Sequence, residues 1–382
     1  MSNSPINSSF SNSGKPRVMV AMSGGVDSSV AAGVMVEAGY DVIGFTMKLR
    51  DATPEEMGGQ KGSCCSPDDL MDARVACDVL GIPHYVVDYR EVFKQAVIDP
   101  FAESYLVGRT PNPCVNCNEK VKFAPLLERA KALGAEYLVT GHYAQIKENS
   151  QGERALFRGA DLDKDQSYFL FGMNQEALDM TLFPLGHMVK DEVRDYAKKL
   201  GLPNWDKADS EDICFVPQGN YAEVIEKLVG PEKTPKSGPI VDVNGNKVGA
   251  HNGLHHYTIG QRRGLGVSTG ERVYVVDIQP ETRTLVVGSS EHLQAQGLRA
   301  LNCRYRNDAT VVGLQDITAQ IRYRNRGVSA QLMARGQAAE VFFSLPQSAV
   351  TPGQAVVFYK DQEVIGGGWI EEAIMGEELS VI

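Results

Sequence analysis

Arg-Val-Met-Val-Ala-Met-Ser-Gly-Gly-Val-Asp-Ser-Ser-Val, residues 17–30, is the stretch that decides the fold of the N-terminal half. Its apolar part, Val18–Met22, predicts a buried strand. The two glycines that follow allow a sharp turn and a close approach of the backbone to a ligand. Residues 28–38 then read as a helix that ends at Gly39. Because a helix that starts directly after a strand points N–H groups and a positive dipole end at the turn, the stretch favours a bound phosphate.

The turn differs from two common phosphate-binding motifs. An ordinary P-loop carries a lysine before its hydroxyl residue, where this chain has Asp27. The G-x-G-x-x-G of dinucleotide folds is absent as well. Ser23–Ser28 instead resembles the SGGxDS pyrophosphate loop of the ATP pyrophosphatases, which cleave ATP to AMP and pyrophosphate to adenylate a carbonyl oxygen. The plain alternative is a glycine-rich strand–turn–helix with no such role. The resemblance implies that ATP contacts Ala21, Met22, Ser23, Gly24, Gly25, Val26, Asp27 and Ser28.

Strand-like and helical patterns alternate from residue 17 to about residue 202. This alternation predicts an α/β domain with a doubly wound parallel sheet, similar to the adenine nucleotide alpha hydrolases, and a ligand site at the carboxyl edge of the strands. Further strands are predicted at 41–47, 84–88 and 136–140, and helices at 67–80, 91–107 and 118–133.

The pattern changes after Pro217 to short β-rich runs. Hairpins are predicted over 241–248, around Asn244-Gly245, and over 273–287. Later strands are predicted at 319–322, 339–343, 355–359 and 363–367, a spacing typical of small β-barrels or sandwiches. We therefore expect two small β-rich domains after the α/β domain. The predicted boundaries are a disordered tail at 1–16, a catalytic domain at 17–222, a central β domain at 223–295 and a C-terminal β-barrel at 296–382.

Composition narrows the class of protein. The 382 residues include seven cysteines and no recognisable export signal, which predicts reduced thiols and a cytoplasmic protein. No apolar run is long enough to cross a membrane, and we expect a monomer. The net charge of −10 does not favour a nucleic-acid partner. Residues 296–336 nevertheless hold only two acids, Asp308 and Asp316, against seven arginines at positions 299, 304, 306, 322, 324, 326 and 335.

Two cysteine-containing segments point to sulfur chemistry. Pro111–Asn118 contains two prolines, Cys114 and Cys117, and is predicted to be a defined loop just before a helix. The start of a helix favours a thiolate over a thiol. The alternative is half of a metal site, but the chain has no second C-x-x-C for a zinc site with four cysteine ligands. The other segment places Cys214 between Ile213 and Phe215, where the alternative is a buried structural cysteine.

Taken together, these segments resemble one family, the tRNA-specific 2-thiouridylases, over nearly the whole chain. No single motif is specific, but their order and spacing are. The matching segments are Ser23–Ser28, Gly108–Pro113, Cys117-Asn118, Thr140–Tyr143, Lys164–Phe169, Ile213–Phe215 and Tyr257–Arg262.

The resemblance implies thiolation of the wobble uridine in tRNAs for Lys, Glu and Gln. ATP would adenylate the 2-oxygen of the base, so that AMP becomes the leaving group. Cys214 would receive sulfur as a persulfide from a sulfur-donor protein, and Cys117 would be the partner nucleophile. A Cys117–Cys214 disulfide would then close the cycle and require a reductant.

The same resemblance implies further contacts. Met47 and Gly141 would touch the nucleotide, and Asp27 would hold Mg²⁺, which prefers carboxylate and phosphate oxygens. Asn112, Pro113 and Cys114 would touch the target base, which costs little to flip out of an anticodon loop. The tRNA would meet Lys164, Asp165, Gln166, Arg322, Tyr323 and Arg324.

One residue departs from the family pattern, because many members have Asp where this chain has Cys114. Thiols at 114, 117 and 214 could together hold a [4Fe-4S] cluster with one open iron, which we keep as a second mechanism. Two other functions also stay open. One is a different adenylating enzyme, which would not need paired thiols. The other is a non-enzymatic RNA-binding protein that uses the C-terminal β domains.

Overall fold

The structure is a computed structural model that describes residues 14–51, 67–209, 213–216, 220–268, 270–306 and 313–376. The predicted tail lies outside these residues as far as position 13, as do Cys64 and Cys65. The chain forms two compact units. Unit 1 comprises residues 1–92, 119–167 and 173–214, and unit 2 comprises residues 93–118, 168–172 and 215–382.

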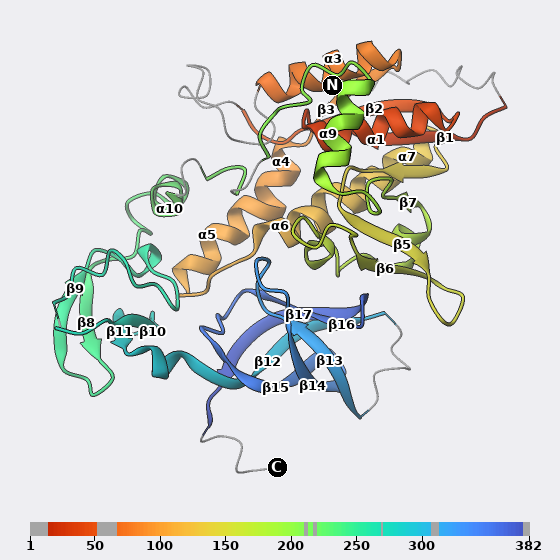
Figure 1. Ribbon diagram of the computed structural model, residues 1–382. Coiled ribbons are helices and arrows are strands. Elements are labelled where there is room, and N and C mark those ends of the chain that lie inside the picture. Colours follow the sequence, from red (N-terminus) through yellow and green to blue (C-terminus); the bar gives the residue numbers. More distant parts are fainter. Residues whose placement is uncertain are drawn as a thin grey trace. The chain divides into compact units, whose positions relative to one another are not determined.

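Unit 1 contains a five-stranded parallel sheet in the order β3-β2-β1-β4-β7 (Figure 1). Both faces of the sheet are covered, because three successive residues of β1, Val18, Met19 and Val20, are fully buried. This confirms the predicted doubly wound α/β domain. The strands are β1 Arg17–Ala21, β2 Asp41–Lys48, β3 His84–Asp88, β4 Tyr137–Val139 and β7 Thr181–Leu182.

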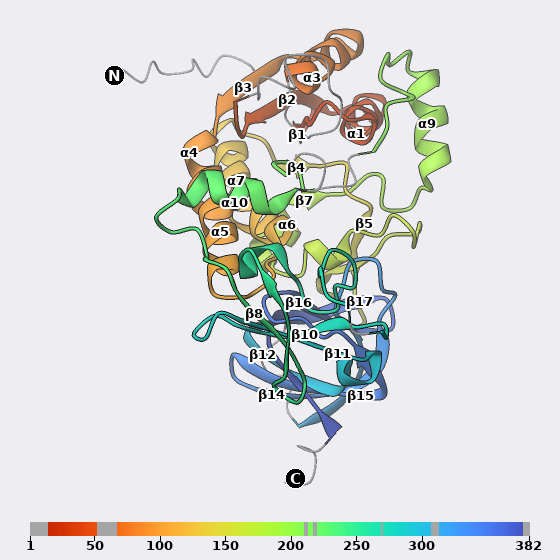
Figure 2. The ribbon, with the colours of Figure 1, turned by 90° about the vertical axis from the view of Figure 1, so that its left-hand side faces the viewer.

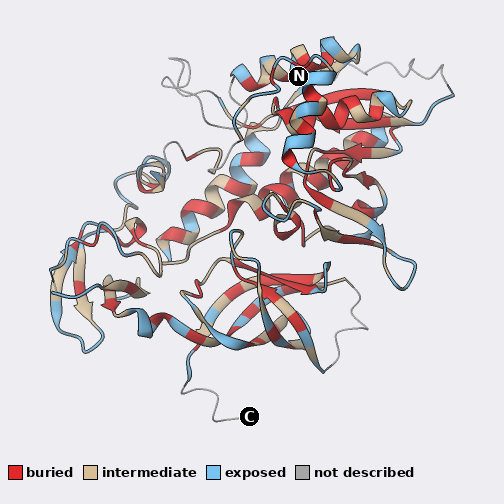
Figure 3. Cartoon of the chain, in the orientation of Figure 1, coloured by how far each residue is buried: buried red, intermediate tan, exposed pale blue. Residues whose placement is uncertain are grey.

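Three helices pack together over one face of this sheet. They are α1 Val26–Glu37, α3 Pro67–Leu80 and α9 Lys190–Lys199, and their apolar side chains form one core with those of β1 and β2. Figure 3 shows the buried residues concentrated in these strands and on the inner sides of the helices. The sequence prediction missed several elements of unit 1, namely β5 Ala144–Glu148, β6 Arg154–Arg158, α8 Gln175–Asp179, the short strand β7 and helix α9. Helix α7, Ala124–Ala132, precedes β4.

The strand order places a ligand-binding edge at β1. Its neighbours are β2 on one side and β4 on the other, so the chain leaves the carboxyl ends of these central strands in opposite directions. The turn after β1 and the turn after β4 meet there. A Cβ atom at Gly141 would lie 2.7 Å from both the Asp27 carbonyl carbon and the Ser28 nitrogen. The backbone after β4 therefore touches the start of α1.

The chain passes from unit 1 into unit 2 within a nearly continuous helix made of α4 Arg90–Phe93, η1 Lys94–Ile98 and α5 Asp99–Leu106. The next helix begins at α6, Pro113–Asn116, and continues as η2, Cys117–Phe123. The prediction of a loop over 111–118 and a helix from 118 is therefore wrong for its second half, since Cys114 and Cys117 are already helical. The physical reason is Pro113, whose fixed φ suits the first position of a helix.

A four-stranded sheet in the order β10-β11-β8-β9 follows helix α10, Tyr221–Val229. Its bounds are β8 Gly238–Asp242, β9 Lys247–His251, β10 Tyr274–Gln279 and β11 Thr284–Gly288. The predicted Asn-Gly turn joins β8 to β9, with Gly245 at φ 85°. A short helix, η5 Leu254–His256, packs Leu254 into the core of this sheet.

The last six strands close into an antiparallel barrel in the order β12-β15-β14-β13-β16-β17, with β17 pairing back to β12 (Figure 2). One predicted strand, 319–322, is wrong at its end. Strand β13 stops at Gln320, because the Gln320 side-chain amide donates to the carbonyls of Arg322 and Tyr323 and closes a turn. The strands are β12 Gln294–Tyr305, β13 Leu314–Gln320, β14 Val328–Arg335, β15 Ala338–Ser348, β16 Ala355–Lys360 and β17 Glu363–Ile374.

The described ranges contain no helix that combines the length and the apolar character needed to cross a membrane.

Candidate functional site

The turn between β1 and α1, which we call the pyrophosphate loop (Ser23–Ser28), requires glycine at its second position. Gly24 has φ +79°, and a Cβ atom there would lie 2.0 Å from the backbone oxygen of Asp69. A side chain would therefore meet both backbone strain and a direct overlap with the start of α3. The backbone conformation of the loop follows from this residue.

Two side chains that the sequence did not indicate hold the loop through the carbonyl of Gly24. Asn204 Nδ2 donates to the Gly24 carbonyl at 3.1 Å and to Ser29 Oγ at 3.1 Å. Lys207 Nζ reaches the same Gly24 carbonyl at 3.2 Å and pairs with Asp69 at 2.6 Å. Because these donors occupy the carbonyl, the loop keeps one orientation of that peptide.

The N-terminus of α1 suits an anion. Gly25 is the N-cap, and no side chain of the described residues makes a capping hydrogen bond there. Ser28 Oγ accepts from the Ser23 amide at 3.1 Å and donates to the Gly25 carbonyl at 3.0 Å, which keeps the loop tight around the helix start. The arrangement presents the amides of the first turn and the positive end of the helix dipole on the ligand-binding edge.

Asp27 belongs to a chain of charges within unit 1. Lys190 Nζ lies 2.8 and 2.9 Å from its two oxygens, and the Tyr143 hydroxyl donates to Oδ1 at 2.8 Å. The largely buried Lys190 also pairs with Asp209 at 2.7 Å, and Asp209 pairs with Lys164 at 2.6 Å. Lys190 therefore joins two carboxylates.

These charges change two pKa values. Burial and the nearby Asp27 carboxylate raise the pKa of Tyr143, so it is a hydroxyl donor at neutral pH. Burial of Asp209 acts to raise its pKa, but the hydrogen bonds from Lys164 and Lys190 outweigh burial and the net shift is downward. Asp209 is therefore a carboxylate at neutral pH. Nothing in the sequence beyond their charge indicates a role for Lys190 or Asp209, since each is far from the pyrophosphate loop along the chain.

The other predicted nucleotide contacts lie near the same edge. Met47 is half-buried near the end of β2, one residue after Thr46, whose hydroxyl donates to the Met22 carbonyl at 2.9 Å. Gly141 touches the start of α1. His142 beside it is buried, hydrogen-bonded to Thr140 Oγ1 at 2.7 Å, and burial lowers its pKa to about 3. His142 is thus a neutral residue of the core.

Side chains of the predicted tRNA-contacting segment, residues 164–166, form hydrogen bonds with other residues of unit 1. The buried Asp165 accepts from Arg158 at 3.0 Å and from Ser167 Oγ at 2.9 Å. Gln166 accepts from the Tyr143 amide at 3.0 Å. Asp165 and Gln166 thus fix the turn that presents Lys164, and a contact of this segment with tRNA stays a prediction.

The cysteines fall in both units. Cys117 is buried and Cys114 half-buried in unit 2, in what we call the thiol segment (residues 109–118). Cys214 is half-buried and is the last residue of unit 1. The next residue, Phe215, belongs to unit 2 and packs edge-on against Phe101 with ring centroids 5.1 Å apart. The relation between Cys117 and Cys214 stays a prediction.

The barrel holds the beginning of the thiol segment. Arg109 forms a two-pronged ion pair with Glu371 of β17 at 2.7 and 2.5 Å. Gln354 Nε2 donates to the carbonyls of Thr110 and Pro111, both at 3.0 Å. The Thr110 amide in turn donates to the Pro352 carbonyl at 3.0 Å. The sequence did not indicate these contacts, which join residues more than 240 positions apart.

The predicted base-contacting residues are anchored in the same unit. Asn112 is buried and shares a side-chain hydrogen bond with Tyr168, whose pKa is raised by burial against the effect of that bond. The Tyr168 hydroxyl donates to the Ala355 carbonyl of β16 at 2.9 Å. Pro113 is buried and starts α6, which carries Cys114. The thiol segment is therefore held at both ends of its non-helical part.

The arginine-rich stretch is less positive than its composition indicates. Three of its arginines form ion pairs with acids of the barrel: Arg299 with Glu372 and Glu340, Arg335 with Glu340, and Arg306 with Glu363. At the turn after β13, Arg322 is exposed and donates to the Ala349 carbonyl at 3.0 Å. Tyr323 packs against Phe169, with the two ring centroids 4.5 Å apart. Exposed Arg324 follows in the same turn.

The fold and the pyrophosphate loop together define a class of protein, a HUP-type nucleotide-binding domain followed by β-barrels. A family model described as "tRNA methyl transferase HUP domain" matches residues 16–218. Models described as "tRNA methyl transferase PRC-barrel domain" and "Aminomethyltransferase beta-barrel domain" match residues 226–289 and 295–370.

Curated relatives narrow this class. The tRNA-specific 2-thiouridylase MnmA of Methylorubrum populi is 48% identical over 362 residues, 93% of each chain. The protein of the same name from Carboxydothermus hydrogenoformans is 45% identical, over 94% of this chain and 99% of its own. This chain belongs to the family of tRNA-specific 2-thiouridylases.

Two solved structures are similar to part of the chain, with low TM-scores. A 4-thiouridine synthetase in complex with RNA and ATP has a TM-score of 0.34 and 18% identity, covering 57% of this chain and 51% of its own. The NMN synthetase of Francisella tularensis has a TM-score of 0.32 and 18% identity, covering 56% of this chain and 77% of its own. The family assignment rests on the curated relatives alone.

Proposed function

We propose that this protein catalyses the ATP-dependent 2-thiolation of the wobble uridine in tRNAs for Lys, Glu and Gln, with release of AMP and pyrophosphate. The observation that carries the proposal is the pyrophosphate loop, held in one conformation by Gly24, Asn204 and Lys207 at the sheet edge of a chain that belongs to this family.

The nucleotide half of the reaction belongs to unit 1. Amides of Ser23–Ser28 hold the phosphates, with Met47 and Gly141 against the nucleotide. Asp27 and Asp209, joined by Lys190, offer carboxylate oxygens that suit Mg²⁺. An ion held there would supply positive charge for the departing pyrophosphate. Lys190, which pairs with both carboxylates, offers a further cation near the phosphates.

In this proposal, Cys214 and Cys117 carry out the transfer of sulfur to the activated base. The terminal sulfur of a Cys214 persulfide, delivered by a sulfur-donor protein, attacks C2 of the adenylated base and AMP leaves. The Cys117 thiolate then attacks Cys214 Sγ, which breaks the sulfur–sulfur bond and leaves the new sulfur on the base. The product is a Cys117–Cys214 disulfide, and an external dithiol supplies the two electrons that reduce it.

Recognition of the tRNA belongs to both units. We assign contact with the target base to Asn112, Pro113 and Cys114. Lys164 of the segment 164–166 and the turn Arg322-Tyr323-Arg324 meet the tRNA around it. We place the reaction in the cytoplasm, with a monomeric enzyme.

The alternatives predict different chemistry. A [4Fe-4S] cluster on Cys114, Cys117 and Cys214 would require iron and sulfide in proportion to activity after anaerobic purification. Substoichiometric iron with full activity excludes it. A different adenylating enzyme would keep its turnover after Cys117→Ser and Cys214→Ser. A non-enzymatic RNA-binding protein would release no pyrophosphate with tRNA and ATP.

The direct test is a thiolation assay with tRNA, ATP and a persulfide donor, read by the mobility shift of thiolated tRNA. We expect the shift to require ATP and to be absent for Asp27→Ala, which should still bind tRNA. Unchanged turnover of Asp27→Ala would refute the assignment of the pyrophosphate loop.

A further inference from the structure

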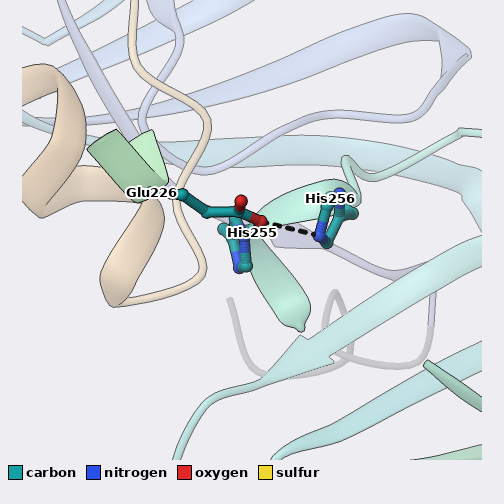
Figure 4. A group of neighbouring side chains, drawn as sticks. All are labelled: Glu226, His255 and His256. Atoms are coloured by element: carbon teal, nitrogen blue, oxygen red, sulfur yellow. Dashed lines mark hydrogen bonds and ion pairs between the residues drawn. The ribbon is translucent and has the colours of Figure 1, made fainter. Parts of the chain in front are cut away.

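A group of three metal-ligating side chains lies in unit 2, among residues that the proposed reaction does not use. Glu226 comes from α10, and His255 and His256 come from η5 (Figure 4). Within the described part of the chain, this is the one group in which three or more His, Cys, Asp or Glu side chains bring their ligand atoms within 4.8 Å of one another.

The spacing of the ligand atoms suits a small tetrahedral ion. His255 Nε2 lies 3.0 Å and His256 Nε2 lies 3.4 Å from the same Glu226 oxygen, Oε1. Bonds of about 2.0–2.1 Å to Zn²⁺ give tetrahedral edges of roughly 3.3 Å. Both imidazole nitrogens therefore lie close to a tetrahedral edge length from the same carboxylate oxygen, and all three ligand atoms lie within 4.8 Å of one another.

The two nitrogens of His255 differ in their surroundings. Without an ion, His255 Nε2–H donates to Glu226 Oε1 at 3.0 Å. Among the described residues, the buried Nδ1 of His255 has no hydrogen-bond partner, whereas His251 Nδ1 accepts from the Gly253 amide at 3.1 Å. A metal ion at Nε2 would take the place of that proton, and the unused Nδ1 could carry the proton instead.

The group is closed on one side and open on the other. The His255 side chain is fully buried, whereas the side chains of Glu226 and His256 are 41% and 37% exposed. Three protein ligands with solvent access leave a fourth position for water, as in open zinc sites. Two nitrogen ligands exclude Mg²⁺ and Ca²⁺, which take oxygen.

We propose that Glu226, His255 and His256 form a binding site for a divalent transition-metal ion, with Zn²⁺ as the best match. The ion would clip α10 to η5 within unit 2. The proposal does not depend on the thiolation reaction, because none of the three residues has a role in it.

The test is a Zn²⁺ titration of the full-length protein against a chromophoric chelator. Because thiols also bind Zn²⁺, the titration is made in a Cys114→Ser/Cys117→Ser/Cys214→Ser background. His256→Gln and Glu226→Gln are the variants, since both residues are partly exposed and their loss should leave the fold intact, as circular dichroism checks. His292→Gln is the matched control, because His292 is in the same unit and bonds to Ser289 instead.

We expect the background protein and His292→Gln to bind one equivalent of Zn²⁺ that both site variants bind at least about tenfold more weakly, since even outer-shell losses cost 10–100-fold. Co²⁺ in place of Zn²⁺ should give the visible bands of a tetrahedral nitrogen–oxygen site without thiolate charge transfer. If the site variants bind Zn²⁺ as the control does, or if the background protein binds none, the three residues form a hydrogen-bonded cluster only and the proposal fails.

Discussion

The pyrophosphate loop and the thiol segment are held in place in different ways. The shape of the loop depends mainly on its own residues: Gly24 determines the turn, Ser23 and Ser28 share a hydrogen bond, and α1 starts within the motif. Asn204 and Lys207 of the same unit then hold the Gly24 carbonyl. The thiol segment is fixed largely by what surrounds it, because Glu371 and Gln354 of the distant barrel hold Arg109, Thr110 and Pro111. The comparison teaches that activation of the base should depend on local geometry, and sulfur transfer on the barrel.

The largest effect should separate the two halves completely. Cys117→Ser removes the thiolate that resolves the persulfide, so thiolation should fall at least about 10³-fold, the scale seen when an enzyme loses a nucleophile. Release of pyrophosphate with tRNA should persist for the first turnover, because the pyrophosphate loop is unchanged. The two products are measured in the same reaction, with Cys303→Ser, a buried barrel cysteine, as the control. Thiolation at the wild-type rate would contradict the role of Cys117.

The next variant breaks the other half. Gly24→Ala places a Cβ 2.0 Å from the Asp69 oxygen at a positive φ, so the loop must move. A displacement of about 1 Å in a reacting group can cost 10²-fold, and pyrophosphate release should fall by about that much. The control is Gly39→Ala, which has a φ of +86° but nothing within 4 Å of its Cβ. Equal losses in both variants would show that backbone strain alone, rather than the loop geometry, causes the defect.

A smaller effect should reveal the barrel's part. Glu371→Gln weakens the ion pair with Arg109, and sulfur transfer should fall about tenfold in kcat while pyrophosphate release changes less than twofold. The pair is partly exposed and contributes about 0–1 kcal/mol to stability, so unfolding should hardly change. Glu372→Gln is the matched control, because Glu372 is the next residue of β17 and pairs with Arg299. Equal kinetics of the two variants would remove the barrel from the account of the thiol segment.

The last effect concerns stability rather than turnover, and unit 1 alone. Burial lowers the pKa of His142 from 6.5 to about 3, so the unfolded chain binds a proton below pH 6.5 that the folded chain does not bind. Stability should therefore fall as pH decreases from about 6.5 towards 3, by up to about 1.4 kcal/mol per pH unit from this residue. Urea unfolding of wild type and His142→Asn across this range measures it. An identical slope in the variant would show that His142 does not carry the dependence.

The difference between the two regions also explains what the sequence could reveal. The parallel sheet, the turn at Gly24 and the Asn-Gly hairpin follow from short-range patterns, and the structure has them. No such pattern marks four other side chains, because each contacts a partner 163 to 262 positions away in the sequence. These side chains are Asn204, Lys190, Gln354 and Glu371. A charge or an amide alone does not indicate its partner.

Two features of the structure differ from a simple interpretation of composition. Pairing of Arg299, Arg306 and Arg335 with barrel acids depends on strand register, which composition does not indicate. The predicted helix start lies after Pro113, because two prolines among turn-forming residues resemble a loop unless Pro113 is recognised as the first helical position.

The central claim is that ATP activates the oxygen that sulfur replaces. The most direct test uses tRNA whose target uridine carries ¹⁸O at position 2, in a single turnover with ATP and a persulfide donor, followed by mass spectrometry of the AMP. The account predicts one ¹⁸O atom in the AMP for each thiolated tRNA. Thiolated tRNA formed together with unlabelled AMP would contradict it.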